Sequence, residues 1–185
     1  MNRRAAILAT VAIIAVTATI ELAMGRIAYC KCGYVKAWHG TVMSAENSQH
    51  LSDWYTPSHV IHGLLLYALF WLWARRVPIA TRFVMAVSLE AVWEVLENTP
   101  MVINRYREAT IALDYFGDSV LNSIADILAM SAGFWIAAVA PLALSVTAAF
   151  AMELFVGFMI RDNLALNVIM LVYPLEAIKR WQSGG

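Results

Sequence analysis

Three groups of polar side chains stand in apolar stretches of the sequence, and each group has the spacing of one helix face. The groups are Glu90, Glu94 and Glu97; Asp118, Asn122 and Asp126; and His59 and His62. Side chains three or four residues apart project from the same face of a helix. Histidine and carboxylate side chains exchange protons with a reacting group. These eight residues are therefore the candidate catalytic residues.

In a structural interpretation, the same residues satisfy one another's hydrogen-bonding and charge requirements and have no other role. Carboxylates inside a bundle can be held by Arg, Trp or Tyr donors that fix the register of the helices. However, Glu90, Glu94 and Glu97 on one face repel one another, and a purely structural network would use fewer charges. Clusters of interacting carboxylates are typical of sites that handle protons or bind metals, which is the functional alternative.

Histidine and cysteine are concentrated in one part of the chain. All four histidines fall between residues 39 and 62, and Cys30 and Cys32 precede them. Imidazole, thiolate and carboxylate are the ligands that zinc and other transition metals use. A divalent metal is thus one candidate cofactor, although the spacing matches no standard zinc motif and assigns no ligand. The two cysteines are metal ligands, a disulfide across one residue, or unpaired thiols.

Arg105 and Arg107 lie in the polar segment that follows the three glutamates. Guanidinium groups bind phosphate or carboxylate through paired N–H donors. We therefore predict that both arginines bind a phosphate of the substrate. The structural alternative is that they pair with Glu97, Glu108 or Asp114.

The composition indicates the kind of chain that positions these residues. Of 185 residues, 61% are apolar and 14% are charged, against about 45–50% and about 25% in soluble domains. The formal net charge is zero, which indicates no basic surface for nucleic acid. We predict an all-α fold, a multi-pass transmembrane bundle of five or six helices, with residues 1–185 forming a single membrane domain.

The helix boundaries follow from the length needed to cross a bilayer, about 20 mostly apolar residues. The predicted helices cover about 5–24, 58–74, 78–97, 118–140 and 142–160. The stretch 164–178 contains Pro174 and is either a short sixth span or a segment at the membrane interface. Segments 25–57 and 98–117 are predicted to be loops, and Asp118 is predicted to cap the following helix.

Two further features predict how the helices pack. Ala125, Ala129 and Gly133 form a ridge of small residues that permits close approach between membrane helices. The three polar groups are costly in lipid, and consecutive helices tend to be neighbours. We therefore predict that the helices at 58–74, 78–97 and 118–140 pack together around one polar cavity.

Basic residues near helix ends predict the orientation in the membrane. We assign the tight pairs at residues 3–4, 75–76 and 179–180 to the cytoplasmic side. This assignment favours a cytoplasmic N-terminus in a bacterial cell inner membrane, with segments 25–57 and 98–117 on the outer side.

A resemblance to a known family rests on four runs of residues, which are 46–50, 53–59, 93–98 and 114–123. They resemble an uncharacterised family of bacterial multi-pass inner-membrane proteins, a protein family of unknown function. The resemblance covers nearly the whole chain. It implies a multi-pass membrane protein and no assigned activity.

A looser similarity connects the chain with VanZ-like membrane proteins, which have a His, a later acidic residue, an Arg and an Asp-x3-Asn. Residues that match this pattern are His62, Glu94 or Glu97, Arg105 or Arg107, and Asp118 with Asn122. The long loop with Cys30 and Cys32 departs from the pattern. A role in glycopeptide susceptibility or in the cell envelope is therefore not transferred.

Three functions fit these features. The first is an outer-leaflet hydrolase or transferase that acts on a lipid-linked or envelope substrate through the His and carboxylate residues. The second is a proton- or metal-coupled carrier. The third is a non-catalytic membrane assembly or interaction protein. The partners implied are the lipid bilayer and a lipid-linked substrate, with no nucleic acid, and the oligomeric state is not indicated.

Overall fold

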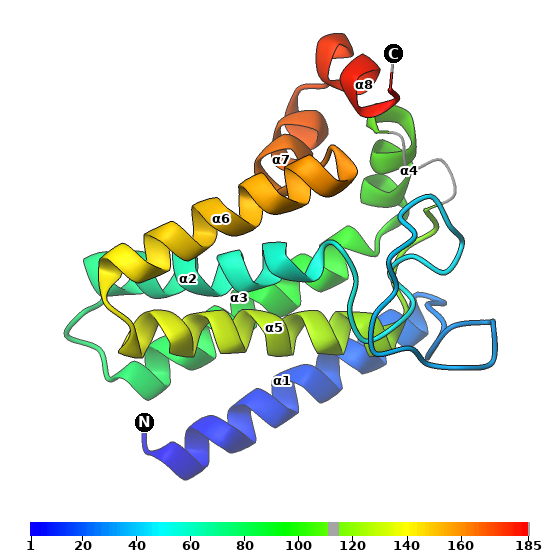
Figure 1. Ribbon diagram of the computed structural model, residues 1–185. Helices are drawn as coiled ribbons and strands as arrows, with labels where there is room; N and C mark the ends of the chain where they lie inside the picture. Colours follow the sequence, from blue (N-terminus) through cyan, green and yellow to red (C-terminus); the bar gives the residue numbers. More distant parts are fainter. Residues whose placement is uncertain (111–114, 185) are drawn as a thin grey trace.

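The computed structural model describes residues 1–110 and 115–184, and these residues form an all-α fold without strands (Figure 1). The helices are α1 (Arg3–Ala23), α2 (Thr56–Trp73), α3 (Ile79–Glu97), α4 (Pro100–Ala109), α5 (Val120–Val139), α6 (Leu142–Ile160), α7 (Leu164–Val172) and α8 (Glu176–Gln182). Asp114, one of the partners considered for the arginines, lies outside the described residues. The all-α prediction is confirmed for the described part of the chain.

The centre of the fold is the contact between α2, α3 and α5, with α1 packed on α3 and α5, and α6 packed on α2 (Figure 1). Apolar side chains from the three central helices form one buried cluster. Its members are Phe70, Ala86, Val87, Ala91, Ile127, Met130 and Phe134. This cluster fixes the three helices side by side, so that the polar faces of all three meet beyond it.

Glycines allow the closest contact, between α2 and α5. A Cβ atom on Gly133 would lie 2.1 Å from the carbonyl oxygen of Val60, and one on Gly63 would lie 2.0 Å from the carbonyl oxygen of Met130. The two backbones therefore touch without side chains between them, as small residues permit in helix pairs. The predicted ridge of small residues includes Gly133, which lies in this contact, whereas Gly63 was missed.

Three helices of the described chain are long and apolar enough to cross a membrane. They are α1, α5 and α6, with mean hydropathies of 2.2, 1.5 and 1.9. The helices α2 and α3 have similar lengths of 18 and 19 residues. The helix α2 carries His59 and His62, and α3 carries four charged residues, which set these two helices apart from the three apolar ones: Arg82, Glu90, Glu94 and Glu97. The described helices are therefore compatible with a multi-pass bundle.

The prediction of a loop at 98–117 is wrong for its first half, which forms α4. The side chain of Thr99 caps this helix by accepting the N–H of Val102, and Pro100 occupies its first turn. The helix is amphipathic, and its Ile103, Tyr106 and Ala109 are buried. The polarity of the segment thus reflects one exposed helix face and not an irregular loop.

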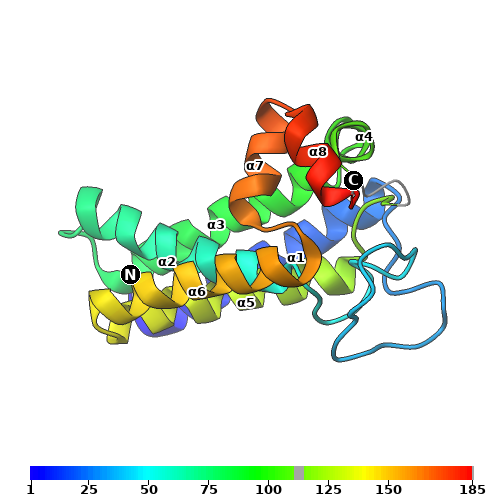
Figure 2. The same cartoon turned by 45° about the horizontal axis from the view of Figure 1, so that its top comes forward.

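The stretch 164–178 is not a sixth span, because it is divided into α7 and α8 near Pro174. A helix of nine residues, the length of α7, is about 13 Å long, against a bilayer core of about 30 Å. The chain therefore turns back, and α4, α7 and α8 lie together at the end of the bundle where the loop at 24–55 also lies (Figures 1 and 2).

Lys179 lies at the opposite end of the bundle from the one that the sequence predicted. Its Nζ donates to the carbonyl oxygen of Glu108 at 2.8 Å, and Arg161 donates to the carbonyl oxygen of Trp181 at 3.1 Å. The basic pair at 179–180 is consequently at the same end as α4, opposite the N-terminus, and does not join the pairs at 3–4 and 75–76.

The N-terminal cap of α5 is Ser119 and not Asp118. The Ser119 hydroxyl accepts the N–H of Asn122 at 3.2 Å. Asp118 instead lies one residue earlier and pairs with Asn98 at the end of α3: the Asn98 side chain accepts the Asp118 N–H at 2.7 Å and donates to its carboxylate at 3.1 Å. This pair connects the end of α3 to the beginning of α5.

Candidate functional site

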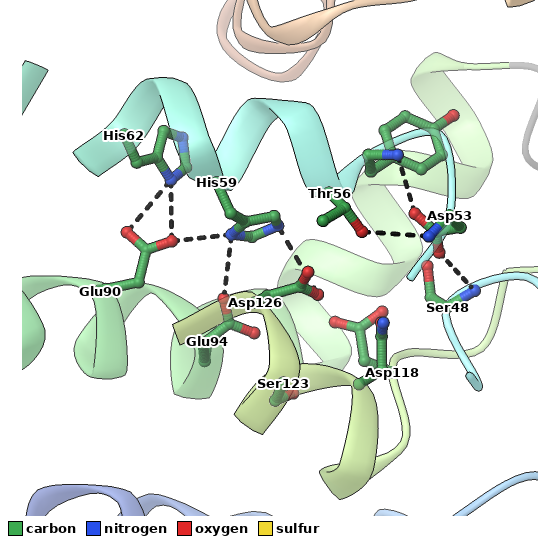
Figure 3. Close-up of polar contacts among 12 residues, drawn as sticks. Ser48, Asp53, Thr56, His59, His62, Glu90, Glu94, Asp118, Ser123 and Asp126 are labelled. Carbon is green, nitrogen blue, oxygen red and sulfur yellow. Dashed lines mark hydrogen bonds and ion pairs between the residues drawn. The ribbon is translucent and has the colours of Figure 1, made fainter. Parts of the chain in front are cut away.

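The two histidines of α2 meet Glu90 of α3 in the interior of the bundle (Figure 3). His59 Nδ1 lies 2.7 Å from Glu90 Oε1, and His62 Nδ1 lies 3.0 Å from the same oxygen. The step of three residues on α2 points both rings at α3. One carboxylate therefore holds two imidazoles in fixed orientations.

A second pair of carboxylates lies against His59. Its Nδ1 is 3.4 Å from Glu94 Oε1 of α3, and its Nε2 is 3.8 Å from Asp126 Oδ2 of α5 (Figure 3). Glu94 is completely buried, and neither of its carboxylate oxygens has a hydrogen-bond donor among the described residues. Side chains predicted on three separate helix faces are thus brought together around one imidazole.

His59, His62, Glu90 and Asp126 form the floor of a partly open cavity of about 400 Å³, which Glu94 does not line. Candidate residues that line it are His59, His62, Glu90, Glu97, Asp118, Asn122 and Asp126. Leu65, Leu66, Leu89 and Val168 line another part of the cavity and make it apolar. The cavity therefore combines a polar floor with an apolar wall, an arrangement suited to an amphiphilic molecule.

Asp118 and Asn122 lie near the beginning of α5 and connect it to its surroundings. The Tyr115 hydroxyl donates to Asp118 at 3.1 Å, and the Asn122 amide donates to the carbonyl oxygen of His50 at 3.0 Å. Burial raises the pKa of the Asp118 carboxyl to about 6, although the Tyr115 hydrogen bond opposes this shift. Asp118 can therefore exchange a proton close to neutral pH, whereas the Asn122 side chain holds the loop.

Two acidic residues of the cavity were missed by the sequence prediction, Asp53 and Asp162. The carboxylate of Asp53 accepts the N–H groups of Ser48 and Tyr55, and the Tyr55 hydroxyl donates to Asp162 at 3.2 Å. Burial raises the pKa of the Asp53 carboxyl, and burial raises that of Asp162 to about 6. The signal available for Asp162 was a short polar break between two apolar helices.

The two arginines predicted to bind phosphate do not line the cavity. Arg105 Nε donates to the carbonyl oxygen of Leu171 at 2.9 Å, near the end of α7, and Arg107 Nε donates to the carbonyl oxygen of Tyr115. Carbonyl groups in the last turn of a helix lack helical partners, which explains the position of Arg105. The predicted phosphate contact with the cavity therefore has no support in the described geometry.

The loop at 24–55 contains a disulfide between Cys30 and Cys32, one of the three alternatives considered. Glu46 is the centre of a hydrogen-bond network in this loop, where it contacts Lys36 at 2.6 Å and His50 at 3.1 Å. The Lys36 hydrogen bond is the largest cause that lowers the pKa of the Glu46 carboxyl to about 2. This network orders the loop beside the beginning of α5.

Two groups of described residues have ligand atoms close enough to share a metal ion. One group is Cys30, Cys32, Glu46 and His50, and the other is His59, His62 and Glu90. In the first group the sulfurs are bonded to each other, and the His50 Nδ1 accepts the N–H of Lys36 at 3.2 Å. The second group has both imidazoles directed at one carboxylate, at the floor of the cavity.

Comparison with known proteins places the chain among proteins without an assigned activity. A family described as "Protein of unknown function (DUF2585)" matches residues 21–184. A UPF0314 protein of Rhizobium meliloti is 57% identical over 185 residues, covering 99% of this chain and 94% of the relative. A UPF0314 protein of Paracoccus denitrificans is 51% identical over 182 residues, covering 98% of this chain and 94% of the relative. No solved structure matches the chain.

Proposed function

Since the chain belongs to the DUF2585 family of proteins of unknown function, we propose from its own geometry that it is a membrane-embedded hydrolase or group transferase. Its substrate is a lipid-linked or envelope molecule that enters the cavity from the outer leaflet. The observation that carries this proposal is the cavity itself, in which a buried cluster of histidines and carboxylates lies beside a wall of leucines.

The proposed topology has five spans, formed by α1, α2, α3, α5 and α6. In this topology α4, α7 and α8 lie at the membrane interface. The N-terminus is cytoplasmic in the inner membrane, and the loop at 24–55 is outside. The disulfide between Cys30 and Cys32 supports this orientation, because disulfides persist in oxidising compartments. The short turn with Arg75 and Arg76 is then cytoplasmic, as the distribution of basic residues favours.

Lateral entry from the bilayer is supported by two leucines of the cavity wall. Leu65 is 56% exposed and Leu89 is 47% exposed, although both line the cavity. An apolar chain lying against them would place the attached headgroup near His62. This histidine retains a 20% exposed side chain, whereas Glu90 is buried.

The charge of the cavity lining limits which kinds of headgroup fit the cavity. Asp53, Asp118, Asp126 and Asp162 line the cavity, and the described lining contains no Lys or Arg. A carboxylate-rich surface repels a bare phosphate and accepts hydroxyl or amine donors. The headgroup that fits is therefore neutral or cationic.

The proposed chemistry is activation of water or of a hydroxyl group by the cluster at the cavity floor. Glu90 holds both imidazoles by their Nδ1 atoms, which leaves Nε2 of His62 available for a proton. Loss of a positioned acid or base typically slows a reaction by about 10²–10⁴-fold. His62 is accordingly the residue whose replacement tests the proposal.

We expect that His62→Ala abolishes lipid processing in cells without unfolding the protein. The test is a Paracoccus denitrificans strain that lacks its relative and is complemented with this chain, followed by quantification of membrane lipids. The deletion strain should accumulate a lipid. Complementation with the wild-type chain should remove this lipid, whereas complementation with His62→Ala should leave it in place. The matched control is His39→Ala, because His39 lies in the outer loop and does not line the cavity. Normal lipid composition with His62→Ala would reject catalysis and favour an assembly role.

We expect Cys32 to react from outside the cell. After mild reduction of intact spheroplasts, an impermeant thiol reagent should label Cys32, which is partly exposed, whereas Cys30 is buried; these are the only two cysteines in the chain. The matched control is a variant with both cysteines replaced by serine and a new cysteine at exposed Arg76. That control should be labelled only after the membrane is opened. The reverse pattern would invert the proposed orientation.

A further inference from the structure

The floor of the cavity has the spacing of a metal-binding site. His59 Nδ1 and His62 Nδ1 lie 2.7 Å and 3.0 Å from Glu90 Oε1, and one ligand atom of each residue lies within 4.8 Å of the others. In a tetrahedral site with zinc–ligand bonds of about 2.0–2.1 Å, neighbouring ligand atoms are about 3.3 Å apart. Small side-chain shifts would therefore admit an ion between the three residues.

Glu94 lies beside this group of three. Its Oε1 is 3.4 Å from His59 Nδ1, and the side chain is completely buried. Both carboxylate oxygens lack a hydrogen-bond donor among the described residues. A buried charge without a donor is costly, and a bound cation removes that cost. The lack of a hydrogen-bond donor at Glu94 is a second observation that points to a cation, besides the spacing of the two histidines and Glu90.

Asp126 has the position of a residue that orients a ligand. Its Oδ2 lies 3.8 Å from Nε2 of His59, on the opposite side of the ring from Glu90. A histidine that binds a metal through one nitrogen commonly donates its other N–H to a carboxylate. When a metal is bound, a proton on Nε2 facing Asp126 would leave the Nδ1 lone pair of His59 for the ion, on the side of the ring where Glu90 and Glu94 lie (Figure 3).

We infer that His59, His62 and Glu90 bind one divalent transition metal, with zinc as the ion that suits the site and the buried carboxylate of Glu94 beside it. Two imidazoles favour zinc over magnesium or calcium, which prefer oxygen ligands. The binding itself is independent of the proposed function. Only its catalytic role rests on that function, in which the metal would lower the pKa of a bound water at the cavity floor.

The test is a zinc titration of the full chain in mild detergent after treatment with a chelator, followed by calorimetry. The wild-type chain should bind one equivalent of zinc, and His62→Ala and Glu90→Gln should lose it. Asp126→Asn should weaken binding by about 10–100-fold, as expected for a residue that orients a ligand. His50→Ala is the matched control and should bind normally, because His50 belongs to the other group of ligand atoms.

X-ray absorption of the zinc-loaded wild-type chain tests the ligands without any variant. The proposal requires nitrogen and oxygen neighbours with imidazole scattering. Sulfur neighbours, loss of binding in His50→Ala, or no stoichiometric zinc in the wild-type chain would each overturn it. If zinc binds at these ligands but the membrane lipids are the same with and without the protein, the proposed function is rejected and the metal site is still supported.

Discussion

Gly133→Ala is expected to separate α2 from α5 and to lower the unfolding midpoint by several degrees. The new methyl group would lie 2.1 Å from the carbonyl oxygen of Val60. A backbone atom in a helix cannot move aside as a flexible side chain can, so the helices themselves must shift. Overpacking of this kind costs about 1–3 kcal/mol. Gly63→Ala should give the same result from the other helix, because its methyl group would meet the Met130 carbonyl oxygen at 2.0 Å.

The effect should extend from stability to the site. Gly63 follows His62 directly, and Val60 follows His59, so a shift of α2 moves both imidazoles relative to Glu90. Thermal unfolding in detergent and zinc affinity are the two measurements. The control is Ala132→Leu, a larger addition at an exposed position of the same helix. If Gly133→Ala has the same unfolding midpoint as the wild-type chain, as the control Ala132→Leu should, the close contact between α2 and α5 is contradicted.

The residues at the centre of the site were predictable from the sequence because they obey helix periodicity. Steps of three and four placed Glu90 and Glu94 on one face and His59 and His62 on another. The cost of turning such faces to lipid then implied that they meet. The geometry of the described residues agrees with this convergence, while the catalytic roles of these residues stay predictions.

The remaining residues of the cavity meet through contacts between distant parts of the chain, which helix periodicity does not predict. Tyr55 and Asp162 are 107 positions apart and meet only because α6 returns to the end of the bundle where α2 begins. Arg105 was expected to bind phosphate because its charge was considered without α7, whose last carbonyl groups provide a closer partner. The helix α4 was missed because polarity was given more weight than the Thr99 and Pro100 start signal.

Glu94→Gln is expected to reduce zinc binding at least tenfold while leaving the metal-free protein as stable as the wild type or more stable. Glutamine keeps the volume of glutamate and cannot ionise, at a buried position where the described residues offer no hydrogen-bond donor to the carboxyl group. An unsatisfied buried group costs about 1–3 kcal/mol, and more when it is charged. Its removal therefore offsets any small loss of packing.

Glu90→Gln is the matched control for Glu94→Gln, since both changes remove one carboxylate from the same helix face. Glu90 contacts His59 at 2.7 Å and His62 at 3.0 Å, so its replacement should lower the unfolding midpoint even without zinc. With zinc at 100 times the dissociation constant of the wild-type chain, that chain should gain about 2.7 kcal/mol of stability, and Glu94→Gln should gain at most about 1.4 kcal/mol. If Glu94→Gln instead destabilises the metal-free protein as much as Glu90→Gln does, Glu94 holds the helices together, and its buried charge is structural.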